Sequence, residues 1–129
     1  MPKYEILDSQ IEKAMKIVWT PQDAVTLDAS GGLNPSNTSD IIDVRGAKAL
    51  TLTVIHNLTG SNSTDLDVIV YSSPDGTTFD TEPYASMNIG ANKVKTIPIT
   101  AGINYLKVKV QNNDTNNATK VTTKLVVSR

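Results

Sequence analysis

The residues that could carry out chemistry are few and far apart. The 129-residue sequence holds one histidine, His56, and no cysteine. Nucleophilic and zinc enzymes place their reactive groups at recognisable spacings, and no Gly-x-Ser-x-Gly elbow, phosphate-binding glycine loop, His-Glu-x-x-His pair or Cys/His cluster occurs. His56 alternates in phase with the apolar residues of its segment, so we expect a structural histidine whose ring nitrogens are hydrogen bonded.

Two groups of carboxylates are the other candidates for a reactive site. Asp65 and Asp67 stand two residues apart, so they share one face of a strand, opposite its apolar residues, where acids are ordinarily solvated. The second group is Asp75, Asp80 and Glu82. Convergence into the acid pair of a glycosidase, or calcium binding without the EF-hand spacing, stays open as an alternative. We nevertheless predict no catalytic, cofactor-binding or metal-binding residue, and no enzymatic activity.

Composition favours one β domain. A chain of this length supplies one core, and its six aromatic residues leave most of that core to Val, Ile and Leu. The absence of cysteine excludes disulfides and thiolate metal sites. The N-terminus lacks the apolar stretch of a signal peptide, and no run approaches the roughly 20 apolar residues of a membrane span. We therefore expect synthesis in the cytoplasm and no membrane contact.

Period-two alternation predicts the elements of that domain. It is clearest from Lys48 to His56 and recurs in short segments separated by Gly, Pro, Asn and Asp, without intervening helical patterns. We predict an antiparallel β-sandwich or barrel of about eight strands. Residues 1–22 are expected to form an N-terminal arm, a helical turn or a strand that ends at Pro21, and residues 23–129 the sandwich domain.

Basic residues gather late in the sequence. Residues 93–129 hold seven basic residues and one acid, a net charge of +6, whereas residues 1–92 hold five basic residues and twelve acids, a net charge of −7. The last two predicted strands alternate lysines with apolar residues, and as a hairpin they would present one basic face. An acidic protein surface suits that face better than nucleic acid, because no aromatic residues are interleaved for base stacking. The candidate interface residues are Lys107, Lys109, Lys120, Lys124 and Trp19.

Three segments together carry a resemblance to a known group. They are Ile42-Asp-Val-Arg-Gly-Ala-Lys-Ala-Leu-Thr-Leu-Thr-Val54, Leu66-Asp-Val-Ile-Val-Tyr-Ser-Ser-Pro-Asp-Gly-Thr-Thr-Phe79 and Ile99-Thr-Ala-Gly-Ile-Asn-Tyr-Leu-Lys-Val-Lys-Val110. Over about residues 40–128 the chain resembles small β-sandwich structural proteins of tailed bacteriophages and prophages. The Asp-Gly turn followed by an aromatic residue also resembles discoidin-like carbohydrate-binding sandwiches, which usually have Trp where this chain has Phe79.

The first resemblance implies a virion component without catalytic residues. We expect a capsid decoration protein or a head–tail (neck) component, made in the host cytoplasm and located in the virion. Its partners would be the major capsid or neck and tail subunits, together with further copies of itself. The alternative is a carbohydrate-binding module, whose stacking platform would be drawn from Trp19, Tyr71, Tyr84 and Tyr105.

Overall fold

The computed structural model describes residues 16–56 and 63–129, and this part of the chain is built from strands. Most of them follow the alternating segments of the sequence, and a short extra strand lies in the polar stretch after residue 27. No helix within the described ranges is long and apolar enough to cross a membrane. The nine strands are β1 (Lys16–Leu27), β2 (Ser36–Thr38), β3 (Ile42–Asp43), β4 (Ala49–His56), β5 (Leu66–Ser73), β6 (Ala85–Ile89), β7 (Lys93–Ile99), β8 (Tyr105–Asn112) and β9 (Thr119–Ser128).

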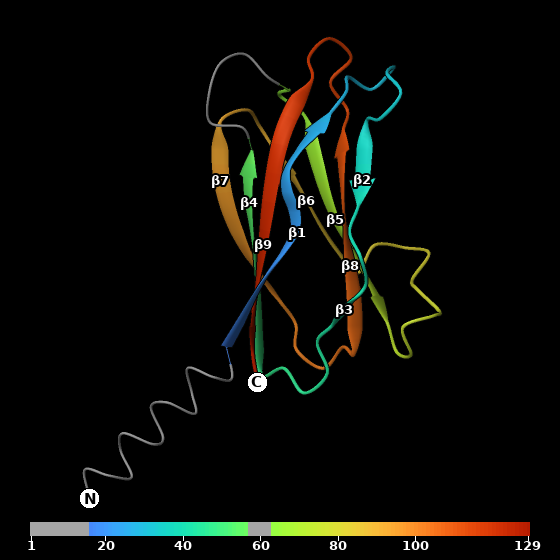
Figure 1. The fold of residues 1–129 in the computed structure, drawn as a ribbon, viewed down its shortest axis with the longest axis vertical. Coiled ribbons are helices and arrows are strands. Elements are labelled where there is room, and N and C mark those ends of the chain that lie inside the picture. Colours follow the sequence, from blue (N-terminus) through green and yellow to red (C-terminus); the bar gives the residue numbers. More distant parts are fainter. Residues whose placement is uncertain (1–15, 57–62) are drawn as a thin grey trace, which may run out of the picture.

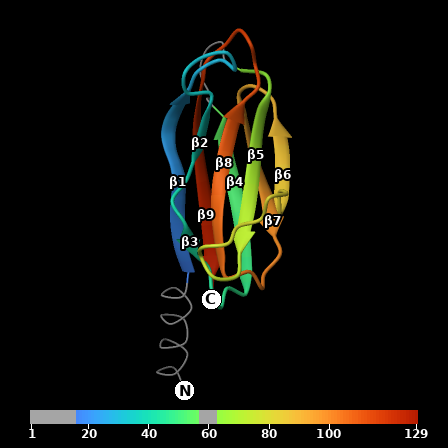
Figure 2. The ribbon, with the colours of Figure 1, turned by 90° about the vertical axis from the view of Figure 1, so that its right-hand side faces the viewer.

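The strands form two antiparallel sheets that face each other (Figures 1 and 2). One sheet has the order β1-β9-β4-β7, and the other has the order β2-β8-β5-β6, with β3 also paired to β8. Apart from the connections from β2 to β3 and from β5 to β6, each connection passes from one sheet to the other. This arrangement is a jelly roll, the two-sheet fold found in viral capsid and lectin domains. The predicted antiparallel β-sandwich is thus confirmed.

Alternating burial explains why these segments are strands. In β4, β8 and β9, and in β5 as far as Tyr71, every second side chain is buried between the sheets and the intervening ones face outward. Most of the buried members are Val and Leu. The β-branched valines pack well on a pleated surface, so local propensity and burial favour the same conformation. Among the fully buried residues are Leu52, Val54, Val68, Val108 and Leu125.

The predicted hairpin of the last two strands is wrong. β8 lies in the sheet with β5, whereas β9 lies between β1 and β4 in the opposite sheet. The polar loop between them therefore carries the chain across the sandwich. Alternation indicates which face of a strand is buried, and it does so equally well for strands that are hairpin partners and for strands in different sheets.

β1 also differs from the prediction, because Pro21 does not end it. The strand pairs with β9 along its length, with register irregularities on both sides of Gln22 and a positive φ of 49° at Ala24. Proline lacks an N–H and is tolerated in an edge strand and at irregular pairing, and β1 provides both. The expected boundary between residues 22 and 23 falls inside this strand, while residues 1–15 of the expected arm lie outside the described residues.

Candidate interaction surfaces

Apolar side chains are exposed along the first half of β1. Trp19 is 38% exposed and Val18 is 59% exposed, and Ile41, in the segment that precedes β3, is 52% exposed. Trp19 pairs with Leu125, whose side chain is buried, so the indole lies on the inner side of the sheet at its open edge. Exposed apolar groups gathered in one place mark a contact site more clearly than the same groups scattered singly.

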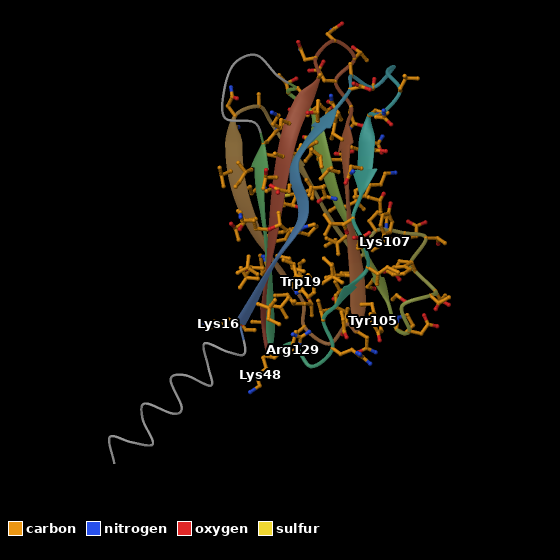
Figure 3. All side chains as sticks on the ribbon, viewed as in Figure 1. Lys16, Trp19, Lys48, Tyr105, Lys107 and Arg129 are labelled. Carbon is orange, nitrogen blue, oxygen red and sulfur yellow. The ribbon has the colours of Figure 1, made fainter. Side chains whose placement is uncertain are left out.

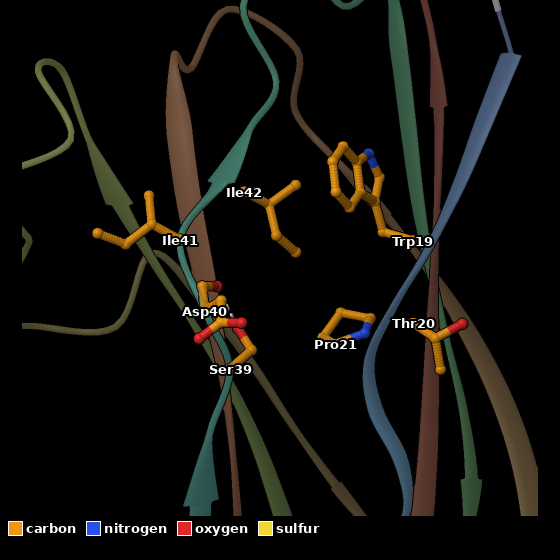
Figure 4. A pocket seen from close by; sticks show the side chains of 7 residues that line it. All are labelled: Trp19, Thr20, Pro21, Ser39, Asp40, Ile41 and Ile42. Atoms are coloured by element: carbon orange, nitrogen blue, oxygen red, sulfur yellow. Dashed lines mark hydrogen bonds between the residues drawn. The ribbon is translucent and has the colours of Figure 1, made fainter.

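A groove separates this half of β1 from the chain that leads into β3 (Figure 4). Its volume is about 130 Å³, below the roughly 300–1,000 Å³ of pockets that enclose small-molecule ligands. The size suits one inserted apolar side chain, the kind of anchor that dominates many protein interfaces. We name it the edge groove; it is lined by Trp19, Thr20, Pro21, Ser39, Asp40, Ile41 and Ile42.

Gln22 closes the sandwich just beyond the edge groove. Its side chain is buried, and its Nε2 donates a hydrogen bond of 2.7 Å to the carbonyl oxygen of Val108 in the opposite sheet. Its Oε1 accepts a hydrogen bond of 2.5 Å from the hydroxyl of Thr123 on β9, which in turn accepts one of 3.0 Å from the Gln22 backbone N–H. The second half of β1 is thus tied to both sheets, and the open edge is confined to the first half.

The four candidate lysines do not form one face. Lys107 and Lys109 lie on β8, and Lys120 and Lys124 lie on β9, so the two pairs are on opposite sheets of the sandwich. All four alternate with buried residues of their strands and therefore point outward. Trp19 is separate from both pairs, at the β1 edge; Figure 3 labels it together with Lys107.

Lys107 rests on aromatic rings. Its Nζ lies 4.4 Å from the centre of the Phe79 ring and 6.0 Å from that of Tyr71, distances at which a cation is attracted to the ring face. The one ion pair among the described residues joins Asp43 and Arg45, so Lys107 has no acidic partner there. The aromatic contacts orient its ammonium group and leave the charge available to a ligand.

The candidate carboxylates are held by hydrogen bonds. Asn88 donates its side-chain N–H to Asp65 at 2.6 Å and to Asp67 at 2.8 Å, and Asn113 donates to the second oxygen of Asp67 at 2.8 Å. Asp75 accepts the backbone N–H groups of Thr78 and Thr77, and these bonds lower the pKa of its carboxyl group to about 2. The described residues contain no group of three or more potential ligands placed to hold a metal ion.

His56 is buried and both of its ring nitrogens have partners, as expected for a structural histidine. Nδ1 lies 2.8 Å from the carbonyl oxygen of Gly90, and Nε2 lies 2.8 Å from the hydroxyl of Thr119. A carbonyl can only accept, so Nδ1 carries the proton and Nε2 accepts from Thr119. Neither nitrogen is left to act on a substrate.

Lowering the pH from about 7.5 to about 5 is expected to reduce the free energy of unfolding. Burial lowers the pKa of His56 below the usual 6.5, against the opposing effect of its hydrogen bond to Gly90. Below about pH 6.5 the unfolded chain binds a proton that the folded protein takes up only at lower pH, so stability present above that pH is lost as the pH falls. Urea denaturation at both pH values measures the change.

Replacement of His56 is the control for this dependence. His56→Gln keeps polar atoms at the site but cannot titrate, so its stability should vary less between the same two pH values. The carboxyl groups of Asp75 and Asp114, with pKa values of about 2, affect stability only in more acidic solution. An unchanged pH dependence in the variant would show that His56 is not its source.

The aromatic residues proposed for carbohydrate stacking lie at separate places. Trp19 is at the β1 edge, whereas Tyr71 and Tyr105 lie on the other sheet, where Lys107 and Arg45 respectively approach their rings. The hydroxyl of Tyr84 donates a 3.3 Å hydrogen bond to the carbonyl oxygen of Thr100. These four rings therefore do not form a single stacking platform.

Fold and surfaces together describe a jelly roll with one open apolar edge. No protein-family model matches the chain, and no curated protein matches its sequence. Solved structures do share its fold. The PBSX exported protein XepA aligns with a TM-score of 0.62 at 9% identity, over 87% of this chain and 37% of its own.

Two further structures show the range of proteins that use this fold. The enzyme N-glycanase F aligns with a TM-score of 0.60 at 14% identity, over 88% of this chain and 42% of its own. The SPBc2 prophage-derived protein YomS aligns with a TM-score of 0.57 at 16% identity, over 88% of this chain and 93% of its own. The chain thus spans less than half of XepA and N-glycanase F and nearly all of YomS. At such identities the likeness shows the fold alone.

Proposed function

We propose that this protein is a structural component of a phage or prophage particle that binds other particle subunits. The observation that carries the proposal is the open apolar edge of β1, where Val18, Trp19 and Ile41 are exposed beside a groove sized for one side chain. An apolar strand edge left uncovered is a template for pairing with another chain. A contact between proteins covers such an edge, and the groove is too small to enclose a drug-sized ligand.

The fold supports the proposal that this protein is part of a phage particle. Jelly rolls recur in viral capsid domains, and prophage proteins are among the solved structures with this fold. Of these, YomS matches this chain over nearly its whole length. Within a particle the protein would act as a capsid decoration protein or a head–tail component, because repetition on a symmetric assembly turns a modest contact into firm attachment.

The proposal includes the absence of catalysis. Asp65, Asp67, Asp75 and Asp80 accept hydrogen bonds from neighbouring groups. His56 is buried with both ring nitrogens bonded. N-glycanase F has the same fold but is only 14% identical to this chain. Its activity therefore gives no reason to expect catalysis here. The separated aromatic rings disfavour the carbohydrate-binding alternative.

Charge reversal on β8 is expected to weaken attachment to particles. Lys107→Glu with Lys109→Glu removes an oriented positive charge from an outward face, while the fold should remain because outward-facing strand positions usually tolerate substitution. The matched control is Lys120→Glu with Lys124→Glu on the opposite sheet, which changes the net charge equally. Cosedimentation of each purified variant with particles that lack the protein measures binding. Equal binding by the two double variants would exclude a specific role for the β8 face.

The function itself is tested by the copy number of the protein in purified particles. Quantitative mass spectrometry against labelled peptides of the major shell subunit gives this ratio. A ratio near one would identify a decoration protein, and a low fixed number would identify a neck or tail component. Absence from purified particles would overturn the proposal.

A further inference from the structure

We infer that the edge groove and the adjoining edge of β1 bind a second copy of this chain. In the proposed dimer the segments Lys16–Thr20 of the two copies pair antiparallel about a two-fold axis at Val18. The two four-stranded sheets then join into one eight-stranded sheet. This inference rests on the proposed function and names the partner of the same surface.

β1 has a free edge in the first half of its length. It is the terminal strand of its sheet, with β9 on one side and, within the described part of the chain, no hydrogen-bonded strand on the other. Near Gln22 the side chain crosses to β8 and β2 and closes this side of the sandwich. The free edge therefore coincides with the exposed apolar residues and with the groove.

The sequence of this edge is self-complementary. Antiparallel pairing centred on Val18 places Val18 against Val18 of the second copy, and Ile17 against Trp19 of the second copy. Ile17 and Trp19 pair with buried residues of β9, so both belong to the inner side of the sheet. The Ile17–Trp19 contact forms twice by symmetry, and aromatic–β-branched cross-strand pairs of this kind stabilise sheets.

The surroundings of the edge also fit a second copy. Ile17 of the second copy would lie beside Trp19, which faces Ile42 across the groove (Figure 4). Lys16 of the second copy would lie opposite the uncharged Thr20 on the outer side of the sheet. The pairing therefore places no like charges opposite each other.

The opposite edge of the same sheet is protected against such pairing. β7 carries Lys93, Lys95 and Pro98, residue types that discourage edge-to-edge association. The segment Lys16–Thr20 has a lysine only at its start and no proline. Of the two edges of this sheet, β1 is the one whose residues permit pairing.

The dimer is tested by sedimentation equilibrium of the whole chain, with Val18→Lys compared with Val94→Lys. The two valines are 59% and 55% exposed and lie on opposite edge strands of one sheet, so the substitutions differ in location and not in chemistry. Val18→Lys should raise the dissociation constant by about tenfold or more, because two lysines would then face each other at the centre. Val94→Lys should leave it unchanged, and circular dichroism should show both variants folded.

A mixture of variants tests the register. In the proposed pairing Lys at position 18 of one copy faces Glu at position 18 of the other, so Val18→Lys mixed with Val18→Glu should dimerise more strongly than either variant alone. A wild-type protein that is monomeric at all concentrations, equal weakening by the two lysine variants, or no gain in the mixture would overturn the inference. The copy number in particles tests the proposed function separately. A protein that is present in particles but monomeric in solution would refute the dimer and leave the proposed function standing.

Discussion

Val68→Asp is expected to leave no folded protein. Val68 is buried at the centre of β5, between β8 and β6 and beneath the opposite sheet. An aspartate there must either bury an unpaired charge or bind a proton at neutral pH, and each costs several kcal/mol. This is a large share of the total stability of a small domain, about 5–15 kcal/mol. Loss of the cooperative urea transition, followed by circular dichroism, is the expected observation.

Ile69→Asp is the matched control. Ile69 is the next residue of the same strand and points to the outer face, where it is only half-buried and lines a shallow hollow. The new carboxylate can remain hydrated, so this variant should fold and lose much less stability. Cooperative unfolding of Val68→Asp with near-wild-type stability would contradict the assignment of the inner face of β5.

Gln22→Ala is expected to lower the free energy of unfolding by about 3 kcal/mol. The substitution removes the amide that links β9 to β8, so the hydroxyl proton of Thr123 loses its acceptor and the Val108 carbonyl keeps only the backbone N–H of Ser39. A buried donor left unsatisfied costs about 1–3 kcal/mol, and the lost bond to Val108 and the lost packing of the side chain add to it. Urea denaturation at neutral pH measures the change.

A double-mutant cycle with Thr123→Val shows whether the two residues act as one unit. Thr123 is buried and bonds both to the side chain and to the backbone of Gln22. The double variant should therefore lose less stability than the sum of the single losses. Additive losses would mean that the bond between the two side chains contributes nothing measurable.

The sequence was sufficient to predict the strands whose two faces differ most. In β4 and β8, buried and outward residues alternate without interruption, so residue type alone locates the strand and its inner face. The structural role of His56 followed from the same phase. The outward position of Asp65 and Asp67 also agrees, with Asn88 bridging the two carboxylates.

Sheet membership could not be predicted in the same way. The loop between β8 and β9 is compatible with a hairpin and with a crossing, and only the packing of both sheets selects the crossing. The two lysine pairs were therefore expected on one face although they lie on opposite sheets. Burial of Gln22 was missed because glutamine is mostly exposed in proteins, and its partners Val108 and Thr123 are distant in sequence.

The sequence predicted only part of the candidate site. Trp19 was among the expected interface residues and is partly exposed, but Ile41 carries no signal of its own. Its proximity to Trp19 depends on how β1 and the segment before β3 flank the opening between the sheets. The edge groove is therefore a product of the fold and not of a local motif.

The most direct test of this account is amide hydrogen exchange of the protein, free in dilute solution and assembled in particles. Exchange in residues 16–20 and 39–42 should become slower on assembly, because the β1 edge and the groove become covered. The β7 edge, Lys93–Ile99, should change little. Unchanged exchange along β1, together with new protection on β7 or confined to the outer faces of the sheets, would contradict the claim that this protein binds through its open edge.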